Sequence, residues 1–158
     1  MKEGGYVNDP ADPGGETNYG ISKRAFPNED MTKLTLARAK VLYKKHYWDK
    51  CEGDALPGWV RLMVFDCAVN QGVTRAVVFM QRILLLPQDG IAGPVTIAAL
   101  DAVSAKDFLT EYTLKRFDAY KSHPQWVAFG KGWMQRLFEI SLMSIKNAPN
   151  DDDERTVQ

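Results

Sequence analysis

The stretch from Pro57 to Gly72, PGWVRLMVFDCAVNQG, constrains the fold more than any other part of the chain. Its residues are apolar on nearly every face of a helix, Pro57 suits the first helical turn, and Gly72 is a natural terminator. A helix that is apolar all round is usually buried at the centre of a domain. The rest of the chain must therefore supply helices that surround it.

The flanking segments have the pattern expected of such helices. Thr35 can cap a helix over residues 35–50, where apolar residues recur every three or four positions. Strand character is confined to residues 17–22, TNYGIS. Further helices are predicted over residues 74–86, from Pro94 to Val103, from a capping-box-like start at Ser104 and Asp107 to about residue 123, and from Pro124 towards Lys146. The sequence thus predicts a mainly α-helical fold with a small N-terminal β-hairpin and loop edge.

Length and composition favour one compact domain. The chain has 158 residues, of which 45% are hydrophobic, enough to bury one sizeable core. We expect a single domain over residues 1–147, with an N-terminal part at 1–73 and a helical lobe at 74–147. Residues 148–158 have almost nothing to bury and are expected to be disordered.

Charge and hydropathy exclude several classes of partner. Twenty Lys and Arg balance twenty Asp and Glu, so the chain has no electrostatic footprint for nucleic acid or an anionic membrane surface. Its apolar runs are too short to span a bilayer, and its start has no secretion signal. We expect a soluble monomer that does not insert into membranes.

The cysteines and histidines do not form a recognisable site. Cys51 and Cys67 are too sparse for a disulfide framework, and Cys67 fits a small core residue; whether the two pair is left open. His46 and His123 have no ligand motif around them. No metal site is expected, and no cofactor is implied.

The opening MKEGGYVNDPADPGGETNYGIS concentrates carboxylates among glycines and prolines. Hydrolysis of a glycosidic bond needs an acid to protonate the leaving oxygen and usually a second carboxylate across the bond. Glu3 and Asp12 could form such a pair, with the Thr17 hydroxyl orienting a water. The alternatives are ordinary turn-forming acids, or a calcium loop, for which the acid spacing is wrong.

Two further pairs of residues have a structural and a functional interpretation. Asp66 and Asn70 lie on one face of the apolar helix, where they either satisfy neighbouring polar groups or face a cleft. Trp126 and Trp133 share a helix face, where they either pack in the core or stack on sugar rings.

The run EGGYVNDPADPGGETNYGIS resembles the signature of glycoside hydrolase family 108, the N-acetylmuramidases found among phage endolysins and related bacterial proteins. FDCAVNQG and FGKGWMQR resemble further motifs of that family, and DGIAGPVT resembles a turn of peptidoglycan-binding modules. The resemblance implies a lysozyme-like fold and bacteriolytic cleavage of the β-1,4 bond between N-acetylmuramic acid and N-acetylglucosamine in bacterial peptidoglycan. It also implies that the Glu of Glu-Gly-Gly-Tyr, here Glu3, is catalytic.

T-even phage lysozymes offer a second resemblance, because they place Glu, Asp and Thr in this order at similar spacing. It implies that Glu3 is the general acid, Asp12 the partner carboxylate and Thr17 a water-positioning residue. In both families an N-terminal helix precedes the catalytic Glu, whereas only Met1 and Lys2 precede Glu3 here. Glu3 would then be held by other contacts, or by a longer natural chain. Candidate substrate-binding residues are Tyr6, Tyr19, Asn70 and Trp133.

Two alternatives stand beside the muramidase hypothesis. The DGIAGPVT turn is also compatible with a non-catalytic peptidoglycan-binding module, and a single catalytic Glu is compatible with a lytic transglycosylase. For an endolysin-type enzyme without an export signal, we expect synthesis in a host cytoplasm and action on the wall in the periplasm or outside the cell.

Overall fold

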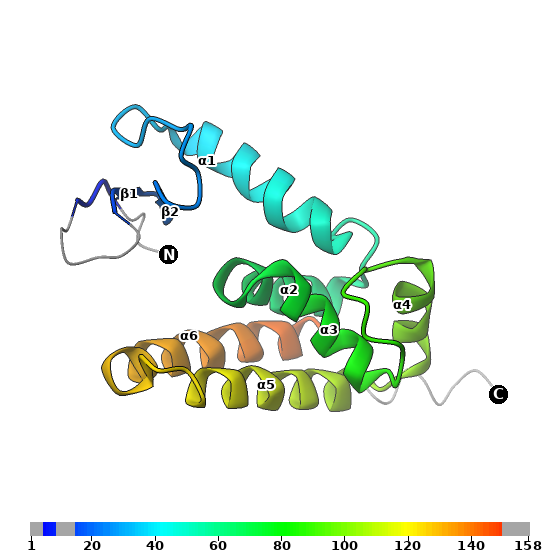
Figure 1. Ribbon diagram of the computed structural model, residues 1–158. Coiled ribbons are helices and arrows are strands. Elements are labelled where there is room, and N and C mark those ends of the chain that lie inside the picture. Colours follow the sequence, from blue (N-terminus) through cyan, green and yellow to red (C-terminus); the bar gives the residue numbers. More distant parts are fainter. Residues whose placement is uncertain (1–4, 9–14, 150–158) are drawn as a thin grey trace. The chain divides into compact units, whose positions relative to one another are not determined.

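The computed structural model describes residues 5–8 and 15–149. These residues fall into two compact units, one within residues 1–46 and one within residues 47–158. The elements are coloured along the chain in Figure 1. The fold is mainly helical, with one small antiparallel sheet near the N-terminus, as the sequence predicted.

The first unit contains a β-hairpin and a helix. Strands β1 (Thr17–Asn18) and β2 (Ile21–Ser22) pair antiparallel, and α1 spans Leu36–Tyr43. A small core binds these parts together; its buried members are Ile21, Met31, Leu34, Ala39 and Leu42. The hairpin expected over residues 17–22 is confirmed.

The second unit is a helical bundle around α2 (Gly58–Gln71), which contacts α3, α5 and α6. Helices α5 and α6 run side by side in opposite directions (Figure 1). The other elements of the unit are α3 (Val73–Ile83), α4 (Pro94–Ala98), a 3-10 turn (Ala99–Ala102), α5 (Ala105–Lys121) and α6 (Trp126–Lys146). The helix that is apolar all round is thus the central one, as expected.

Several helix starts follow from local capping. The Thr35 hydroxyl accepts a hydrogen bond from the backbone N–H of Arg38, and the Ser104 hydroxyl accepts one from Asp107. Pro94 occupies the first turn of α4. Each of these helices begins within a residue of its predicted start.

The helix predicted over residues 35–50 is shorter than expected. After Tyr43 the chain continues as a π-helical segment (Lys44–Trp48) and a 3-10 turn (Asp49–Cys51). Glu52 then adopts a left-handed backbone, φ +53°, and Gly53 lies against the ring of Trp48, where an added Cβ would be 2.4 Å from ring carbons. Periodicity along the sequence does not register this local change of helical pitch.

Residue 73, after which we expected a separate helical lobe to begin, lies inside the second compact unit. The expected boundary falls where α3 follows α2, and these two helices pack against each other inside the second unit. Both helices contribute to one continuous apolar core, so the division falls upstream, between His46 and Tyr47. The expected disordered tail at 148–158 lies largely outside the described residues.

Candidate functional site

Val7 and Thr17 are paired across the N-terminal edge of the first unit. The backbone N–H of each residue donates to the carbonyl oxygen of the other, and both N···O distances are 2.8 Å. The segment that follows Glu3 in the sequence is thus joined to the strand that carries Thr17. Glu3 and Asp12 themselves lie outside the described residues.

Two side chains fix the hairpin within its unit. The buried Asn18 amide donates to the carbonyl oxygen of Met31 at 2.8 Å, and the Tyr43 hydroxyl donates to that of Tyr19 at 3.1 Å. Met31 belongs to the small core and Tyr43 to α1. The hairpin therefore has a defined position relative to α1.

The three described candidate residues of this edge have different surroundings. The half-buried Thr17 hydroxyl donates to the Gly15 carbonyl at 3.4 Å, a long bond that leaves its oxygen able to accept from a water. Tyr19 is half-buried with a left-handed backbone, φ +50°. Tyr6 is exposed, and partial desolvation together with the nearby Glu16 carboxylate raises its pKa. Thr17 and Tyr6 thus remain accessible to a ligand.

A second carboxylate near this edge is engaged in an ion pair. Glu29 lines a pocket of about 240 Å³ in the first unit, where its carboxylate binds the guanidinium of Arg38. The hydrogen bond from Arg38 lowers the pKa of Glu29. A carboxylate held ionised in this way is a poor proton donor, so Glu29 does not fit the role of general acid.

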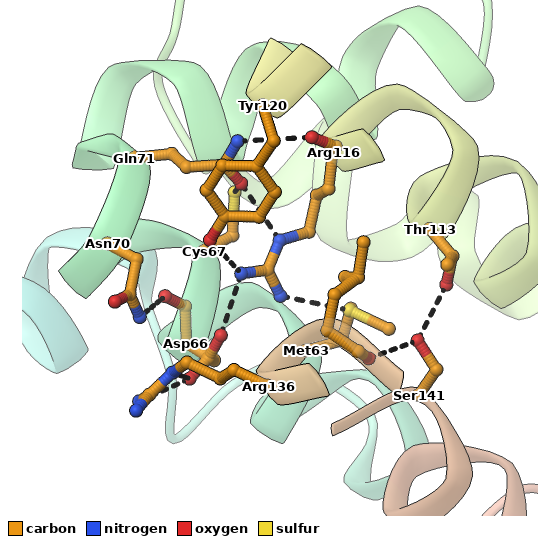
Figure 2. A network of polar contacts seen from close by, with 11 residues as sticks. Met63, Asp66, Cys67, Asn70, Gln71, Thr113, Arg116, Tyr120, Arg136 and Ser141 are labelled. Carbon is orange, nitrogen blue, oxygen red and sulfur yellow. Dashed lines mark hydrogen bonds and ion pairs between the residues drawn. The ribbon is translucent and has the colours of Figure 1, made fainter. Parts of the chain in front are cut away.

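In the second unit, the Asp66 carboxylate binds two guanidinium groups (Figure 2). Arg116 Nη2 donates to Oδ2 at 2.7 Å, and Arg136 binds Oδ1 through Nε at 2.7 Å and Nη2 at 2.6 Å. Asp66 and Arg116 are buried, while the Arg136 side chain is 41% exposed. Of the two interpretations of Asp66, the structure thus supports satisfaction of neighbouring polar groups.

Next to this network is an open pocket of about 170 Å³, called here the polar pocket. It brings together two predicted substrate-binding residues, Asn70 from α2 and Trp133 from α6, although they are far apart in the sequence. The polar and aromatic side chains that line it are Asn70, Gln71, Arg75, Tyr120, His123 and Trp133.

Trp133 is packed among other rings at one side of this pocket. Tyr120 and Phe129 stack on it in nearly parallel planes, with centroids 5.2 Å and 6.0 Å away, and the His123 ring meets it at 86°. These neighbours occupy much of the ring surface on which a sugar could stack. Trp126, by contrast, is partly buried against the core, where it packs over Gly130 and against Phe117.

The sequence patterns did not identify most of the residues that surround Asn70 and Trp133 in the polar pocket. Arg116 follows Phe108 and Tyr112 at intervals of four, so it lies on the buried stripe of α5. This spacing could have predicted that Arg116 is buried, but an arginine is normally expected at the surface. Arg75 and His123 had no signal, because only the packing of α2, α3, α5 and α6 brings them to Asn70.

The DGIAGP turn uses its polar groups internally. The buried Gln81 amide donates to Asp89 Oδ1 at 2.6 Å and to the Ile91 carbonyl at 3.1 Å, and it accepts from the Gly90 N–H at 3.0 Å. These hydrogen bonds to Gln81 hold the conformation of the turn. The side chain of Ile91 is 65% exposed at its surface.

The described part of the chain shows no cluster of three or more His, Cys, Asp or Glu residues able to hold a metal ion. Cys51 and Cys67 are both buried free thiols. Among the helices in these same ranges, none is both long enough and apolar enough to cross a membrane.

Comparisons with known proteins extend these observations. Residues 1–72 match the family described as Glycosyl hydrolase 108. Among solved structures, the chain is similar to SagA of Brucella abortus at 32% sequence identity and a TM-score of 0.85, covering 95% of this chain and 91% of SagA. No curated protein matches the chain. Family match and full-length relative together place the chain in the Glycosyl hydrolase 108 family, whose members are glycosidases acting on carbohydrate.

Proposed function

We propose that this glycosidase is an endolysin-type N-acetylmuramidase that hydrolyses the β-1,4 bond between N-acetylmuramic acid and N-acetylglucosamine. The observation that carries the proposal is the family match over residues 1–72, the part that contains Glu3, Asp12 and Thr17. The Val7–Thr17 pairing supports it, because it joins the segment that follows Glu3 in the sequence to strand β1, which follows Asp12. The substrate is then the glycan strand of peptidoglycan, and the site of action is the bacterial cell wall.

In this proposal Glu3 protonates the leaving glycosidic oxygen as general acid. Asp12 is the partner carboxylate, which activates water or stabilises positive charge on the sugar ring. Thr17 holds a water through its hydroxyl oxygen, which its long bond to Gly15 leaves able to accept a hydrogen bond. Tyr6 and Tyr19 contribute to sugar binding from the same edge. The helical unit recognises the substrate through the polar pocket, and DGIAGPVT is part of a wall-binding surface.

The test is digestion of purified peptidoglycan by the wild-type chain and by Glu3→Gln. Hydrolysis releases soluble fragments with new reducing ends, and loss of the general acid should lower the rate roughly 100-fold or more. Glu111→Gln, which removes a carboxylate from an exposed position on α5, serves as the matched control, with activity close to wild type. Unchanged digestion by Glu3→Gln would refute the assignment of Glu3.

The same digest separates the alternatives. Mass spectrometry of the fragments distinguishes reducing muramic acid ends from the anhydro ends of a lytic transglycosylase. A chain that sediments with the wall but releases no fragments would be a binding module. Thermal melting of each variant shows whether a loss of activity reflects unfolding.

A further inference from the structure

The polar pocket contains a positive charge that no acidic side chain balances. Arg75 lines it, and no Asp or Glu is among its lining residues. Arg75 is exposed and forms no hydrogen bond or ion pair with any residue in the described ranges. Its guanidinium keeps all its donors for a ligand, in a planar fork that matches a carboxylate.

The wall behind the pocket adds to this charge. Arg116 and Arg136 share the single carboxylate of Asp66, which leaves one excess positive charge in the network. Gln71 and Tyr120 lie between the network and the pocket: Arg116 donates through Nε to Gln71 Oε1 at 2.9 Å and through Nη2 to the Tyr120 hydroxyl at 3.2 Å. Arg116 is buried whereas the Arg136 side chain is 41% exposed, so solvent screens the excess charge in part, and its sign favours an anion.

Two lining groups have donors left for such an anion. His123 Nδ1 accepts from the Gln125 N–H at 3.2 Å, which leaves the N–H at Nε2 as the donor of this ring. The Tyr120 hydroxyl accepts from Arg116 and can still donate its own proton. Asn70 differs, because its amide nitrogen donates to the Asp66 carbonyl at 2.8 Å and its side-chain oxygen is available as an acceptor.

We propose that the polar pocket binds a carboxylate carried by an acidic amino sugar or by the peptide attached to it. The proposal rests on the proposed function, and it deepens that function by assigning recognition of the acidic part of the substrate to the second unit. Arg75 binds the carboxylate, Tyr120 and His123 donate to it, and Asn70 accepts from an amide N–H of the same ligand. A volume of about 170 Å³ suits one such substituent.

The test measures direct binding by NMR, following the indole signal of Trp133 and the backbone signal of Asn70. The probes are N-acetylmuramic acid, its methyl ester, a muramoyl dipeptide and N-acetylglucosamine, none of which contains a bond that the proposed hydrolysis would cleave. At least one of the two acidic probes should bind at least about tenfold more tightly than the ester and the neutral sugar, and which of them does so identifies the carrier of the carboxylate. Preference for N-acetylmuramic acid indicates a sugar-borne carboxylate, and preference for the muramoyl dipeptide indicates a peptide-borne one.

Arg75→Gln should lower the affinity for the acidic probe about tenfold, to that of the neutral sugar. Arg75→Lys should keep part of the preference, because lysine retains the positive charge but lacks the planar fork of donors. Lys106→Gln, which removes an equal charge from an exposed position on α5, is the matched control and should bind like wild type. Equal binding of acidic and neutral probes, or an unchanged preference in Arg75→Gln, overturns the proposal. Because no probe is hydrolysed, this result is independent of whether the chain cleaves peptidoglycan.

Discussion

Arg116 and Asp66, 50 positions apart, form an ion pair in which both side chains are buried and Nη2 lies 2.7 Å from Oδ2. Arg136 binds the other oxygen of the same carboxylate. One side chain of the central helix α2 is therefore bound to both α5 and α6 (Figure 2). Removing either partner of the buried pair would leave an uncompensated charge in the core.

Asp66→Asn should therefore destabilise the second unit strongly. We expect a loss of about 3–5 kcal/mol in the free energy of unfolding, because the Arg116 guanidinium stays buried without a counter-charge. Urea denaturation followed by circular dichroism measures this. Asp118→Asn, at an exposed position on α5, should change stability by less than about 0.5 kcal/mol. Equal stabilities of the two variants would show that the buried pair is not needed.

The Cys51 thiol should be unreactive in the folded protein. Burial raises its pKa from 9.0 to about 12, with a further contribution from Cys67, and the thiolate is the reactive form. Iodoacetamide should label neither Cys51 nor Cys67 at pH 8 until denaturant is added, which mass spectrometry detects. Rapid labelling of the native chain at Cys51 would contradict its burial.

The same pKa shift predicts a loss of stability in alkali. Below pH 9 the Cys51 thiol is neutral in the folded and in the unfolded chain, so its contribution to the free energy of unfolding is fully present. Between about pH 9 and 12 the thiol loses its proton in the unfolded chain but keeps it in the folded one, so stability falls as the pH rises. Urea midpoints measured across this range should fall less steeply for Cys51→Ala than for wild type. Parallel curves would show that another group is responsible.

Gly90→Ala should destabilise the DGIAGP turn for two separable reasons. The residue has φ +74°, and an added Cβ would lie 2.8 Å from Cγ2 of Thr74. Left-handed backbone costs a non-glycine residue about 1–2 kcal/mol. In a Thr74→Ser background, which lacks Cγ2, the substitution should cost less but not nothing. A thermal-melting double-mutant cycle measures the difference, and full rescue by Thr74→Ser would exclude the backbone contribution.

Thr17→Val should lower wall hydrolysis without affecting the hairpin. Valine keeps the branched shape and the backbone pairing with Val7, but lacks the hydroxyl proposed to hold a water. A lost hydrogen bond of about 1–2 kcal/mol corresponds to a rate roughly 5- to 30-fold lower. Thr17→Ser restores the hydroxyl and should retain most activity. Equal rates for both variants would remove Thr17 from the mechanism.

Local patterns predicted the parts of the fold that depend on neighbouring residues. Thr35 and Ser104 cap helices because a hydroxyl accepts from an N–H three residues on, a relationship that is visible in the sequence. The hairpin at 17–22 and the end of α2 at Gly72 were likewise predicted from residues that are neighbours in the sequence. The mainly helical class followed from the apolar central helix.

Relationships between distant segments were beyond such patterns. The spacing of Asp66 and Asn70 predicted a shared face, but only the arrangement of the helices separates their roles, one bound to Arg116 and Arg136 and the other lining the pocket. For Glu3 and Asp12, the proposed roles came from the resemblances to known families. Their geometry lies outside the described residues.

Gln71 gives the polar pocket a wall that is already ordered before a ligand binds. Its side chain accepts from Arg116 Nε at 2.9 Å and donates to the Arg116 carbonyl at 3.3 Å, so both ends of the amide are held by one residue of α5. Its rotamer is selected when the helices pack, and little conformational entropy remains to be lost on binding. The affinity that we propose for this pocket is therefore linked to the folding of the bundle. A change in the core that releases Gln71 should weaken binding even where every exposed contact residue is intact.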